Sequence, residues 1–340
     1  MSIFSLLPQG AGRIEPRRTR LARELRQNSP LFSCRIDPTG RFVFAGAQDN
    51  AIHRWDLTSG NRVALTGHRS WIRALAFLRE PRQLVSGGYD GRLIWWQADA
   101  DAPRPLRNVE AHRGWVRAVA VSPDGRMIAT CGNDHLVKLW SAADGAPVRE
   151  LSGHTCHVYN AAFHPDGRHL ASGELRGVVK QWDIARGAEM RSLDASVLHR
   201  YDPTFRADIG GVRGIAFNRD GSLLACAGIT DVTNAFAGIG KPVVVLFDWA
   251  SGKQKFLLRP RENFQGTMWG VVQFSGGVIA ACAGGNGGML WYWKPDAAAD
   301  VFAFKLPNNA RDLDLHPDGR RLAVAFFDGP VRIYDAGPKA

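Results

Sequence analysis

HRGWVRAVAVSPDGRMIATCGNDHLVKLW, residues 112–140, is the stretch of sequence that decides the fold. It places short apolar runs on either side of the turn Ser122-Pro-Asp-Gly-Arg126, in which Pro fixes φ and Gly supplies the positive φ that a hairpin needs. Apolar runs of roughly four to seven residues are too short for helices and typical of strands. The stretch therefore predicts successive antiparallel strands, the last of which ends at Trp140.

The same pattern recurs along the whole chain of 340 residues. An aromatic residue ends an apolar strand at Trp55, Trp96, Trp140, Trp182, Phe247, Trp293 and Tyr334. The intervals are 41, 44, 42, 65, 46 and 41 residues, which predicts seven repeats with a long fifth one. A second marker, an apolar residue just before a tight turn, precedes the aromatic by 19 residues in six repeats and by 30 in the fifth; the markers are Ile36, Phe77, Val121, Phe163, Phe217, Phe274 and Leu315.

A histidine stands 28 residues before the aromatic in three consecutive repeats, at His68, His112 and His154. With the pairs Trp55-Asp56 and Trp182-Asp183, these residues make the chain resemble the WD-repeat β-propeller family. The resemblance implies an all-β, seven-bladed propeller of four-stranded antiparallel blades. It covers one domain over residues 19–336, with an N-terminal tail over 1–18 and a C-terminal tail over 337–340.

The resemblance also implies a buried hydrogen-bonded chain of His, Ser or Thr, Asp and Trp inside a blade, since these polar groups would be costly to bury without partners. By spacing, the third repeat has His112, Thr130, Asp134 and Trp140, and the second has His68, Ser86, Asp90 and Trp96. The fourth keeps His154, Ser172 and Trp182 but has Arg176 at the position of the Asp. Because Arg only donates hydrogen bonds, we expect Arg176 to leave the blade for solvent.

Closure of the ring needs an outer strand from the N-terminus, because only six residues follow Tyr334. Arg23-Glu24-Leu25 repeats Arg149-Glu150-Leu151, which belongs to the outer strand of the third repeat. Residues 19–26 are therefore predicted to pair with the last blade and remove two open sheet edges. The alternative is a short helix over residues 16–27, favoured by Leu21 and Leu25 four positions apart.

A candidate binding site lies on the inner strands, four residues before each marker. These positions hold Phe32, Arg73, Arg117, Tyr159, Arg213, Gly270 and Arg311. Two positions earlier, on the same strand face, stand Trp71, Trp115, His157 and Met268, and residues before the tetrad Asp position include Tyr89, Asn133 and Phe327. The resemblance implies that partners contact these positions, so we expect a partner-binding mouth made of Arg73, Arg117, Arg213, Arg311, Trp71, Trp115, Tyr89, Tyr159, Phe32, Phe327 and His157. The alternative is that duplication alone made the repeats alike, with each Arg merely solvated at the rim.

The fifth repeat carries two insertions, at residues 194–211 and 229–241, in loops that the resemblance places on one face. The first insertion holds the cluster with acid-base potential, namely His199, Arg200, Tyr201, Asp202 and Asp208. No nucleophile or paired carboxylate accompanies that cluster at a recognisable spacing.

Composition excludes several classes of protein. The chain is 45% hydrophobic with 37 Gly and 11 Trp, so a folded core is expected. Five Cys without C-x-x-C spacing indicate neither a disulfide framework nor a Cys zinc site. The apolar run from Ile3 to Leu7 is too short for a signal peptide, and no segment is long enough to span a membrane.

Lys and Arg number 43 against 32 Asp and Glu, a net charge of +11, and 35 of the basic residues are Arg. Such an excess permits anionic partners but can also arise from genome-wide codon composition. We therefore predict a non-enzymatic protein-interaction scaffold that binds an acidic or phosphorylated protein or peptide. The alternatives are nucleic-acid or polyanion binding through the basic surface and an enzyme with a site in the fifth-repeat loops. We expect no cofactor, no metal, no membrane insertion, a monomer and a cytoplasmic location.

Overall fold

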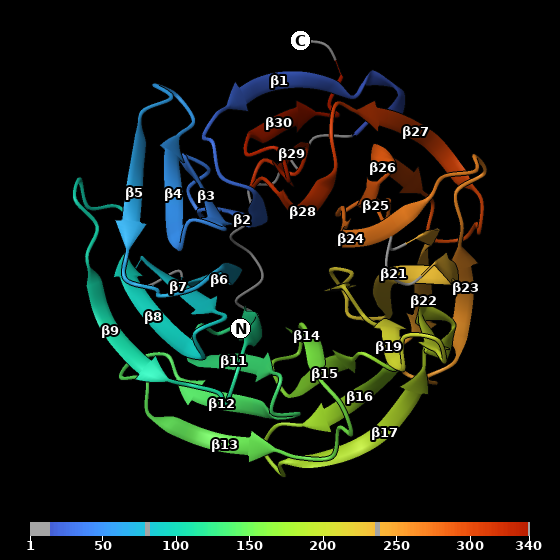
Figure 1. The fold of residues 1–340 in the computed structure, drawn as a ribbon, viewed down its shortest axis with the longest axis horizontal. Helices are drawn as coiled ribbons and strands as arrows, with labels where there is room; N and C mark the ends of the chain where they lie inside the picture. The colour runs from blue at the N-terminus through green and yellow to red at the C-terminus, as the bar shows by residue number, and fades with distance from the viewer. Residues whose placement is uncertain (1–13, 79–81, 235–238, 339–340) are drawn as a thin grey trace.

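Seven four-stranded antiparallel sheets stand around a common axis as the blades of a propeller (Figure 1). The computed structural model describes residues 14–78, 82–234 and 239–338. Blade 1 consists of β2 (Leu31–Ile36), β3 (Phe42–Ala47), β4 (Ala51–Asp56) and β5 (Arg62–Thr66). Blade 2 consists of β6 (Ile72–Leu78), β7 (Gln83–Gly88), β8 (Arg92–Gln97) and β9 (Pro105–Glu110). Blade 3 consists of β10 (Val116–Val121), β11 (Met127–Gly132), β12 (Val137–Ser141) and β13 (Pro147–Leu151).

The remaining blades follow in chain order around the ring. Blade 4 consists of β14 (Val158–Phe163), β15 (His169–Glu174), β16 (Val178–Asp183) and β17 (Ala188–Asp194). Blade 5 consists of β20 (Gly214–Phe217), β21 (Leu223–Asn234), β22 (Ile239–Asp248) and β23 (Gln254–Leu258). Blade 6 consists of β24 (Gly266–Gln273), β25 (Ile279–Gly285), β26 (Gly287–Trp293) and β27 (Asp300–Leu306). Blade 7 consists of β28 (Ala310–Leu315), β29 (Arg321–Phe326), β30 (Val331–Asp335) and β1 (Arg20–Leu25).

The N-terminal strand β1 closes the ring, as the sequence predicts. It runs antiparallel to β30, with Leu21 opposite Tyr334 and Leu25 opposite Val331. Glu24 forms an ion pair with Arg332 at 2.5 Å, within the same sheet. The alternative of a helix over residues 16–27 is wrong, because among the described residues of this segment only Pro16–Arg18 form a 3₁₀ turn.

The ends of the chain lie against blade 7 where the structure describes them. The backbone N–H of Glu15 donates to the carbonyl of Ala336 at 2.7 Å. The tails expected over residues 1–18 and 337–340 fall partly on residues 1–13 and 339–340, which lie outside the described residues. In the part of the chain that is described, no helix is long and apolar enough to cross a membrane.

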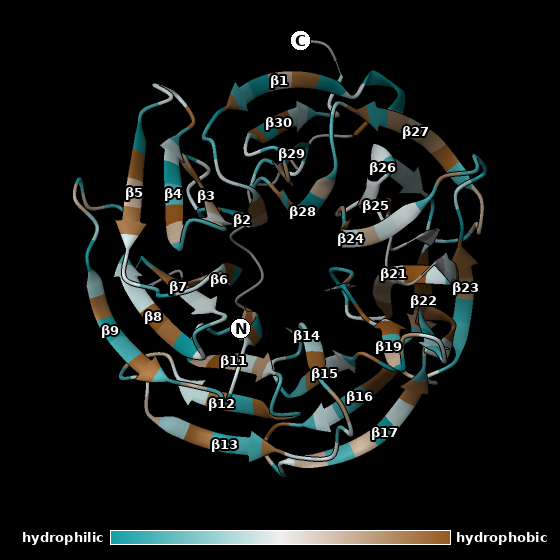
Figure 2. Ribbon diagram, viewed as in Figure 1, coloured by the Kyte–Doolittle hydropathy of each residue, from teal (hydrophilic) through white to brown (hydrophobic). Residues whose placement is uncertain are grey.

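The core consists of apolar layers between neighbouring blades, and apolar residues recur along the strands of every blade (Figure 2). The aromatic that ends the third strand of a repeat packs against the preceding blade. Trp55 of blade 1 is 1% exposed and packs in a cluster with Ala323 and Ile333 of blade 7. The conserved spacing of these aromatics thus reflects one packing position repeated around the ring.

Arginines on outer strands tie each blade to the next, which accounts for part of the basic excess. Each donates to backbone carbonyls in the following blade's last turn; the pairs are Arg23 with Leu57 and Thr58, Arg107 with Ala143, Arg149 with Ala185 and Arg186, and Arg191 with Ala250. We call Arg23, Arg107, Arg149 and Arg191 the outer-strand arginines. Each lies against a glycine of positive φ, where a Cβ would come within 3.0 Å of the Arg side chain; these are Gly60, Gly145, Gly187 and Gly252.

The two insertions of the fifth repeat lie against each other. The first forms the 3₁₀ turn Ser196–Leu198 and a separate hairpin of β18 (His199–Asp202) and β19 (Ala207–Gly210). The second lengthens β21 and β22 beyond the other strands of blade 5. A guanidinium N–H of Arg200 donates to the carbonyl of Val232, which joins the two insertions.

Candidate functional site

Hydrogen-bonded side chains inside the blades make the frame that carries the site. In blade 3, His112 Nδ1 lies 2.8 Å from Asp134 Oδ1, and His112 Nε2 lies 2.7 Å from Thr130 Oγ1. The indole N–H of Trp140 donates to the same Thr130 hydroxyl at 2.8 Å. Burial alone would raise the pKa of Asp134, but the hydrogen bond from His112 lowers it below its ordinary value.

Blade 2 has the same arrangement. His68 contacts Asp90 at 3.1 Å and Ser86 at 2.8 Å, and Trp96 donates to Ser86 at 2.8 Å. All of these polar side chains are satisfied within the blade, so they serve the fold and are not available to a ligand.

Blade 4 completes its chain with a residue that the sequence reasoning missed. His154 Nε2 lies 2.7 Å from Ser172 Oγ, and the Trp182 indole donates to the same hydroxyl at 2.7 Å. His154 Nδ1 then lies 2.8 Å from Glu174 Oε2, two positions before Arg176. The longer Glu side chain reaches from an earlier position on β15, so no aspartate is needed at position 176.

Arg176 is exposed, as expected, and has a partner there. Its Nε and a terminal nitrogen donate to Asp208 Oδ2 at 3.1 and 3.0 Å. Asp208 Oδ1 lies 2.7 Å from His199 Nε2, and Asp202 accepts the backbone N–H of Thr204 in the hairpin's turn. Asp208 therefore anchors the β18–β19 hairpin to blade 4 through Arg176, while His199 and Asp202 make contacts within the hairpin.

The mouth of the propeller is formed by one residue from each inner strand. In six blades it occupies the register shift at the start of that strand, and in blade 5 it immediately precedes β20. We call these seven residues the mouth ring: Phe32, Arg73, Arg117, Tyr159, Arg213, Trp269 and Arg311.

Trp269 takes the place that the sequence assigned to Gly270. The inner turn of blade 6 is one residue shorter than the others, because the N–H of Phe274 bonds to the carbonyl of Val278, four positions on, whereas Ser122 N–H reaches five positions on to Met127. The β25–β26 hairpin is two residues longer, because Ile279 pairs with Trp293, 14 positions on, whereas Ile128 pairs with Trp140, 12 positions on. With one residue fewer in the turn, the net shift is one residue, so counting four positions back from Phe274 stops one residue short of the mouth. The register shift lies between Met268 and Gly270, and Met268 is buried in the core between blades 5 and 6.

Four aromatic rings line one side of the mouth in a continuous stack, which we call the aromatic arc: Phe32, Trp71, Tyr89 and Trp115. Phe32 and Trp71 stack with ring centroids 5.2 Å apart, and Tyr89 and Trp115 stack at 4.0 Å with an interplanar angle of 3°. Trp71 lies 6.0 Å from Tyr89 and joins the two pairs. Trp71 and Trp115 remain 39% and 40% exposed, so part of each ring is accessible to a ligand.

All four arginines of the mouth ring lie beside aromatic rings, and three of them, Arg117, Arg213 and Arg311, lie beside two or more. Arg117 Cζ lies 4.5 Å from the centroid of Trp115 and 4.7 Å from that of Tyr159. Arg213 lies 4.3 Å from Tyr159 and 5.3 Å from Trp269. These cation–π contacts hold the guanidinium groups beside the rings.

The other two arginines also contact Trp269. Arg311 Cζ lies 4.7 Å from its centroid and 4.6 Å from that of Phe327, and Arg73 lies 5.7 Å from Trp269. His157 joins the mouth through Asn133: its Nδ1 lies 3.0 Å from the Asn133 carbonyl, and the Asn133 side chain accepts from Arg117. The structure thus brings all the residues expected at the mouth into one connected surface and adds Trp269.

Among the described residues, no carboxylate pairs with the mouth arginines. Within residues 14–78, 82–234 and 239–338, neither Arg73, Arg117, Arg213 nor Arg311 forms an ion pair, whereas Arg35 farther along the channel pairs with Asp312 at 2.7 Å. Burial, Arg73 and Arg213 together lower the pKa of Arg311 to about 10. Burial, with Arg117 and Arg73, likewise lowers the pKa of Arg213. An anion at this place would therefore be strongly favoured.

These residues open onto a cavity of about 970 Å³ along the propeller axis, lined by inner-strand residues of all seven blades. Arg73, Arg117, Tyr159, Arg213 and Trp269 line it. Small side chains elsewhere on the inner strands leave this volume open. Its volume lies in the range of cavities that bind small molecules.

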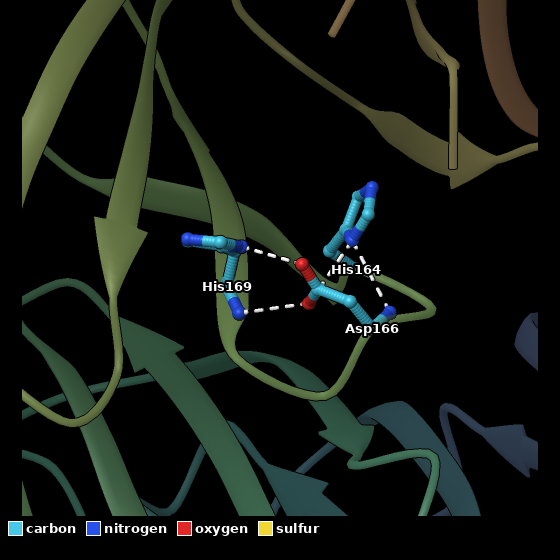
Figure 3. A group of neighbouring side chains, drawn as sticks. All are labelled: His164, Asp166 and His169. Carbon is cyan, nitrogen blue, oxygen red and sulfur yellow. Dashed lines mark hydrogen bonds and ion pairs between the residues drawn. The ribbon is translucent and has the colours of Figure 1, made fainter. Parts of the chain in front are cut away.

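A second group of side chains, His164, Asp166 and His169, has the donor atoms of a metal site (Figure 3). His164 Nε2 lies 3.1 Å from the carbonyl of Gly221 in blade 5, and His164 Nδ1 accepts the backbone N–H of Asp166 at 3.2 Å. Asp166 Oδ2 lies 2.6 Å from His169 Nδ1. Both ring nitrogens of His164 are therefore engaged by backbone groups.

The matching turn of blade 7 has the same contacts without the second histidine. His316 Nε2 lies 3.0 Å from the carbonyl of Gly40 in blade 1, and His316 Nδ1 accepts the N–H of Asp318 at 3.0 Å. Arg321 occupies the position of His169. The group in blade 4 is thus explained as a turn that connects neighbouring blades, and a metal would have to break it.

Comparison with known proteins places the chain among repeat proteins. The family model "WD domain, G-beta repeat" matches residues 20–56, 61–97, 103–141 and 145–183. A 77-residue stretch is 36% identical to the WD repeat and FYVE domain-containing protein 1 of Mus musculus, covering 21% of this chain and 19% of that protein.

Two further relatives match similar lengths. A 75-residue stretch is 33% identical to a U3 snoRNP-associated protein-like protein of Arabidopsis thaliana, covering 22% of this chain and 16% of that protein. A 76-residue stretch is 33% identical to the THO complex subunit 6 homolog of Danio rerio, covering 22% of this chain and 23% of that protein. Each match spans less than a quarter of the relative's length. With four matched repeats and seven blades closed by an N-terminal strand, the chain belongs to the WD-repeat β-propeller family.

Proposed function

We propose that the chain is a non-enzymatic protein-interaction scaffold that binds an acidic or phosphorylated segment of another protein across its mouth. The observation that carries this proposal is the set of four guanidinium groups without a carboxylate partner, beside the aromatic arc. The outer-strand arginines, by contrast, are used within the fold. In the described part of the chain, the mouth gathers four guanidinium groups without an ion pair around one opening.

The chemistry of the mouth suits a peptide better than a small molecule alone. Guanidinium groups bind carboxylates and phosphates through paired hydrogen bonds, and Trp and Tyr faces supply apolar contact area. Arg, Trp and Tyr are also the residues that dominate the binding energy of protein interfaces. A segment with an acidic group next to an apolar side chain would use both parts of this surface.

The names of the relatives are consistent with a role in assemblies. They describe a subunit of a complex and a protein associated with a ribonucleoprotein. For this chain, we propose membership of an assembly because of the unpaired arginines and the aromatic arc at its mouth.

The test compares labelled peptide pools by fluorescence anisotropy with the purified full chain. The pools are Glu-rich, phosphoserine-containing and Lys-rich, and a single-stranded RNA oligonucleotide is added as a separate probe. We expect the Glu-rich or phosphoserine pool to bind and R73Q/R117Q to weaken binding roughly tenfold or more, since each lost charged contact is worth about 1.5–3 kcal/mol.

The matched control is R62Q/R126Q, which removes the same charge at two exposed residues whose side chains form no hydrogen bond or ion pair in the described structure. Equal weakening by both double variants, or preferential binding of the RNA probe, would contradict the proposal. The second result would instead support binding through diffuse basic charge.

A further inference from the structure

Two of the four mouth arginines have no hydrogen-bond acceptor among the described residues, and they flank the same indole. Arg117 donates to Asn133 at 2.7 Å and to Tyr89 at 3.4 Å, and Arg73 donates to the carbonyl of Phe32. Arg213 and Arg311 make no such bond, and their Nε atoms are buried. Arg213 and Arg311 therefore keep all their N–H donors for a ligand, whereas Arg73 and Arg117 already use some of theirs within the fold.

Trp269 contributes a third unpaired donor to this place. Its indole Nε1 is buried and has no acceptor in the described part of the chain. The Cζ atoms of Arg213 and Arg311 lie 5.3 and 4.7 Å from its ring centroid, so both guanidinium groups contact one indole. Unpaired buried donors are costly unless something accepts from them.

We propose that Arg213, Arg311 and Trp269 form a subsite for a phosphate monoester, the side chain of a phosphorylated residue. This assignment rests on the proposed function and narrows it, because it selects a phosphorylated segment over an unmodified acidic one. Arg73 and Arg117 lie beside this subsite and bind other acidic groups of the same segment.

Charge balance favours a dianion here. Three guanidinium groups, those of Arg73, Arg213 and Arg311, lie within 5.7 Å of the Trp269 centroid. A carboxylate would balance one of these charges, whereas a phosphate monoester carries nearly two and offers three acceptor oxygens.

The carboxylates on β28, the strand that carries Arg311, bind other partners. Asp312 lies beside Arg311 in the sequence but pairs with Arg35 at 2.7 Å and accepts the N–H of Cys34 at 3.1 Å. Asp314 accepts the N–H of Ile36 at 2.8 Å. Neither neutralises the subsite, which leaves its positive charge to a ligand.

An aromatic ring lies beside the subsite and can contact the carbon atoms of a phosphate ester. Phe327 lies against Arg311, with its centroid 4.6 Å from Cζ, and is 40% exposed. A phosphate seated between Arg213 and Arg311 would thus have an open aromatic face at its edge, suited to the carbon atoms that carry it.

The experiment is a titration of the ¹⁵N-labelled full chain, observed at the arginine Nε–H and tryptophan indole N–H signals. The probes are phenyl phosphate, inorganic phosphate and benzoate at pH 7.5. We expect phenyl phosphate to shift the signals that R213Q, R311Q and W269F each remove, and to bind at least tenfold more tightly than benzoate. R213Q should weaken phenyl phosphate at least tenfold, while R62Q/R126Q leaves it unchanged.

Equal affinity for benzoate, or shifts confined to Arg73 and Arg117, would overturn the subsite. If an Arg variant fails to fold, two other results test the subsite. These are the signal shifts that phenyl phosphate causes in the unaltered chain and the affinity of W269F, which keeps an aromatic ring. Failure of the subsite and failure of the proposed function are distinguishable. Glu-rich peptides that bind as well as phosphoserine peptides would refute only the subsite, whereas phenyl phosphate binding without any peptide binding would refute only the scaffold.

Discussion

Glu174 accepts a hydrogen bond from His154 at 2.8 Å, although it stands two residues before the position where blades 2 and 3 carry their aspartate. The same carboxylate accepts the backbone N–H of Thr155 at 3.1 Å, as Asp134 accepts that of Arg113 at 3.2 Å. The two acids therefore perform the same task from different positions. This exchange leaves position 176 free for the arginine that anchors the β18–β19 hairpin.

A rescue experiment tests this exchange. E174A should lower the free energy of unfolding by about 2–3 kcal/mol, because it leaves the buried His154 ring without its acceptor. Adding R176D should restore at least half of the loss, since it returns an aspartate to its place in the other blades. Urea denaturation measures both values, with R176A as the control. A double variant no more stable than E174A would show that position 176 cannot reach His154.

Anchoring of the hairpin can be measured without unfolding the protein. Hydrogen bonds from Arg176 lower the pKa of Asp208, with a further one from His199. D208N should make amide hydrogen exchange in residues 199–210 several-fold faster while the melting temperature stays unchanged, because only a local element is released. Unchanged exchange would mean that backbone contacts alone hold the hairpin.

The turn in Figure 3 predicts a specific response to acid. Burial would raise the pKa of Asp166, but hydrogen bonds from the Arg168 N–H and from His169 lower it to about 2. Because the folded pKa lies below the ordinary value, the carboxylate stabilises the fold above about pH 4, and this stabilisation disappears as the pH falls to about 2.

Comparison of D166N with the unaltered chain isolates that effect. The difference in unfolding free energy should be about 1 kcal/mol at pH 6, given solvent screening of a partly exposed group, and should shrink toward pH 2. Denaturant titrations at several pH values provide the measurement. A difference that stays constant down to pH 2 would contradict the assigned pKa.

The outer-strand arginines predict a coupling between blades 3 and 4. Arg149 donates to Ala185 and Arg186, and a Cβ on Gly187 would collide with its side chain. R149A should cost about 1 kcal/mol of stability and G187A about 1–3 kcal/mol, since φ at Gly187 is positive. The double variant should cost less than the sum, because removing Arg149 removes the collision. Strict additivity would show that the two residues act independently.

The repeat spacing predicted the architecture well, because each interval reflects one packing position. The aromatic that ends the third strand must reach the preceding blade, so its place cannot drift, as Trp55 illustrates. Closure by β1 followed from the match of Arg23-Glu24-Leu25 to Arg149-Glu150-Leu151 in the outer strand of blade 3.

The details that sequence reasoning missed come from local changes in length. In blade 6 a β25–β26 hairpin longer by two residues and an inner turn shorter by one together place Trp269 in the mouth, and spacing measured from Phe274 cannot detect these two changes. A longer side chain lets Glu174 replace an aspartate two positions away. The absence of carboxylates beside the mouth arginines, within the described residues, depends on contacts between strands far apart in the chain.

The most direct test of the central claim is the affinity of a phosphoserine peptide pool for two double variants of equal charge. R213Q/R311Q removes the two mouth arginines that lack acceptors, and R62Q/R126Q removes two exposed arginines elsewhere. Measured by anisotropy at one fixed salt concentration, the affinity should fall at least tenfold in the first variant and stay within twofold in the second. Equal affinities for both variants would contradict the claim that the mouth arginines bind the partner.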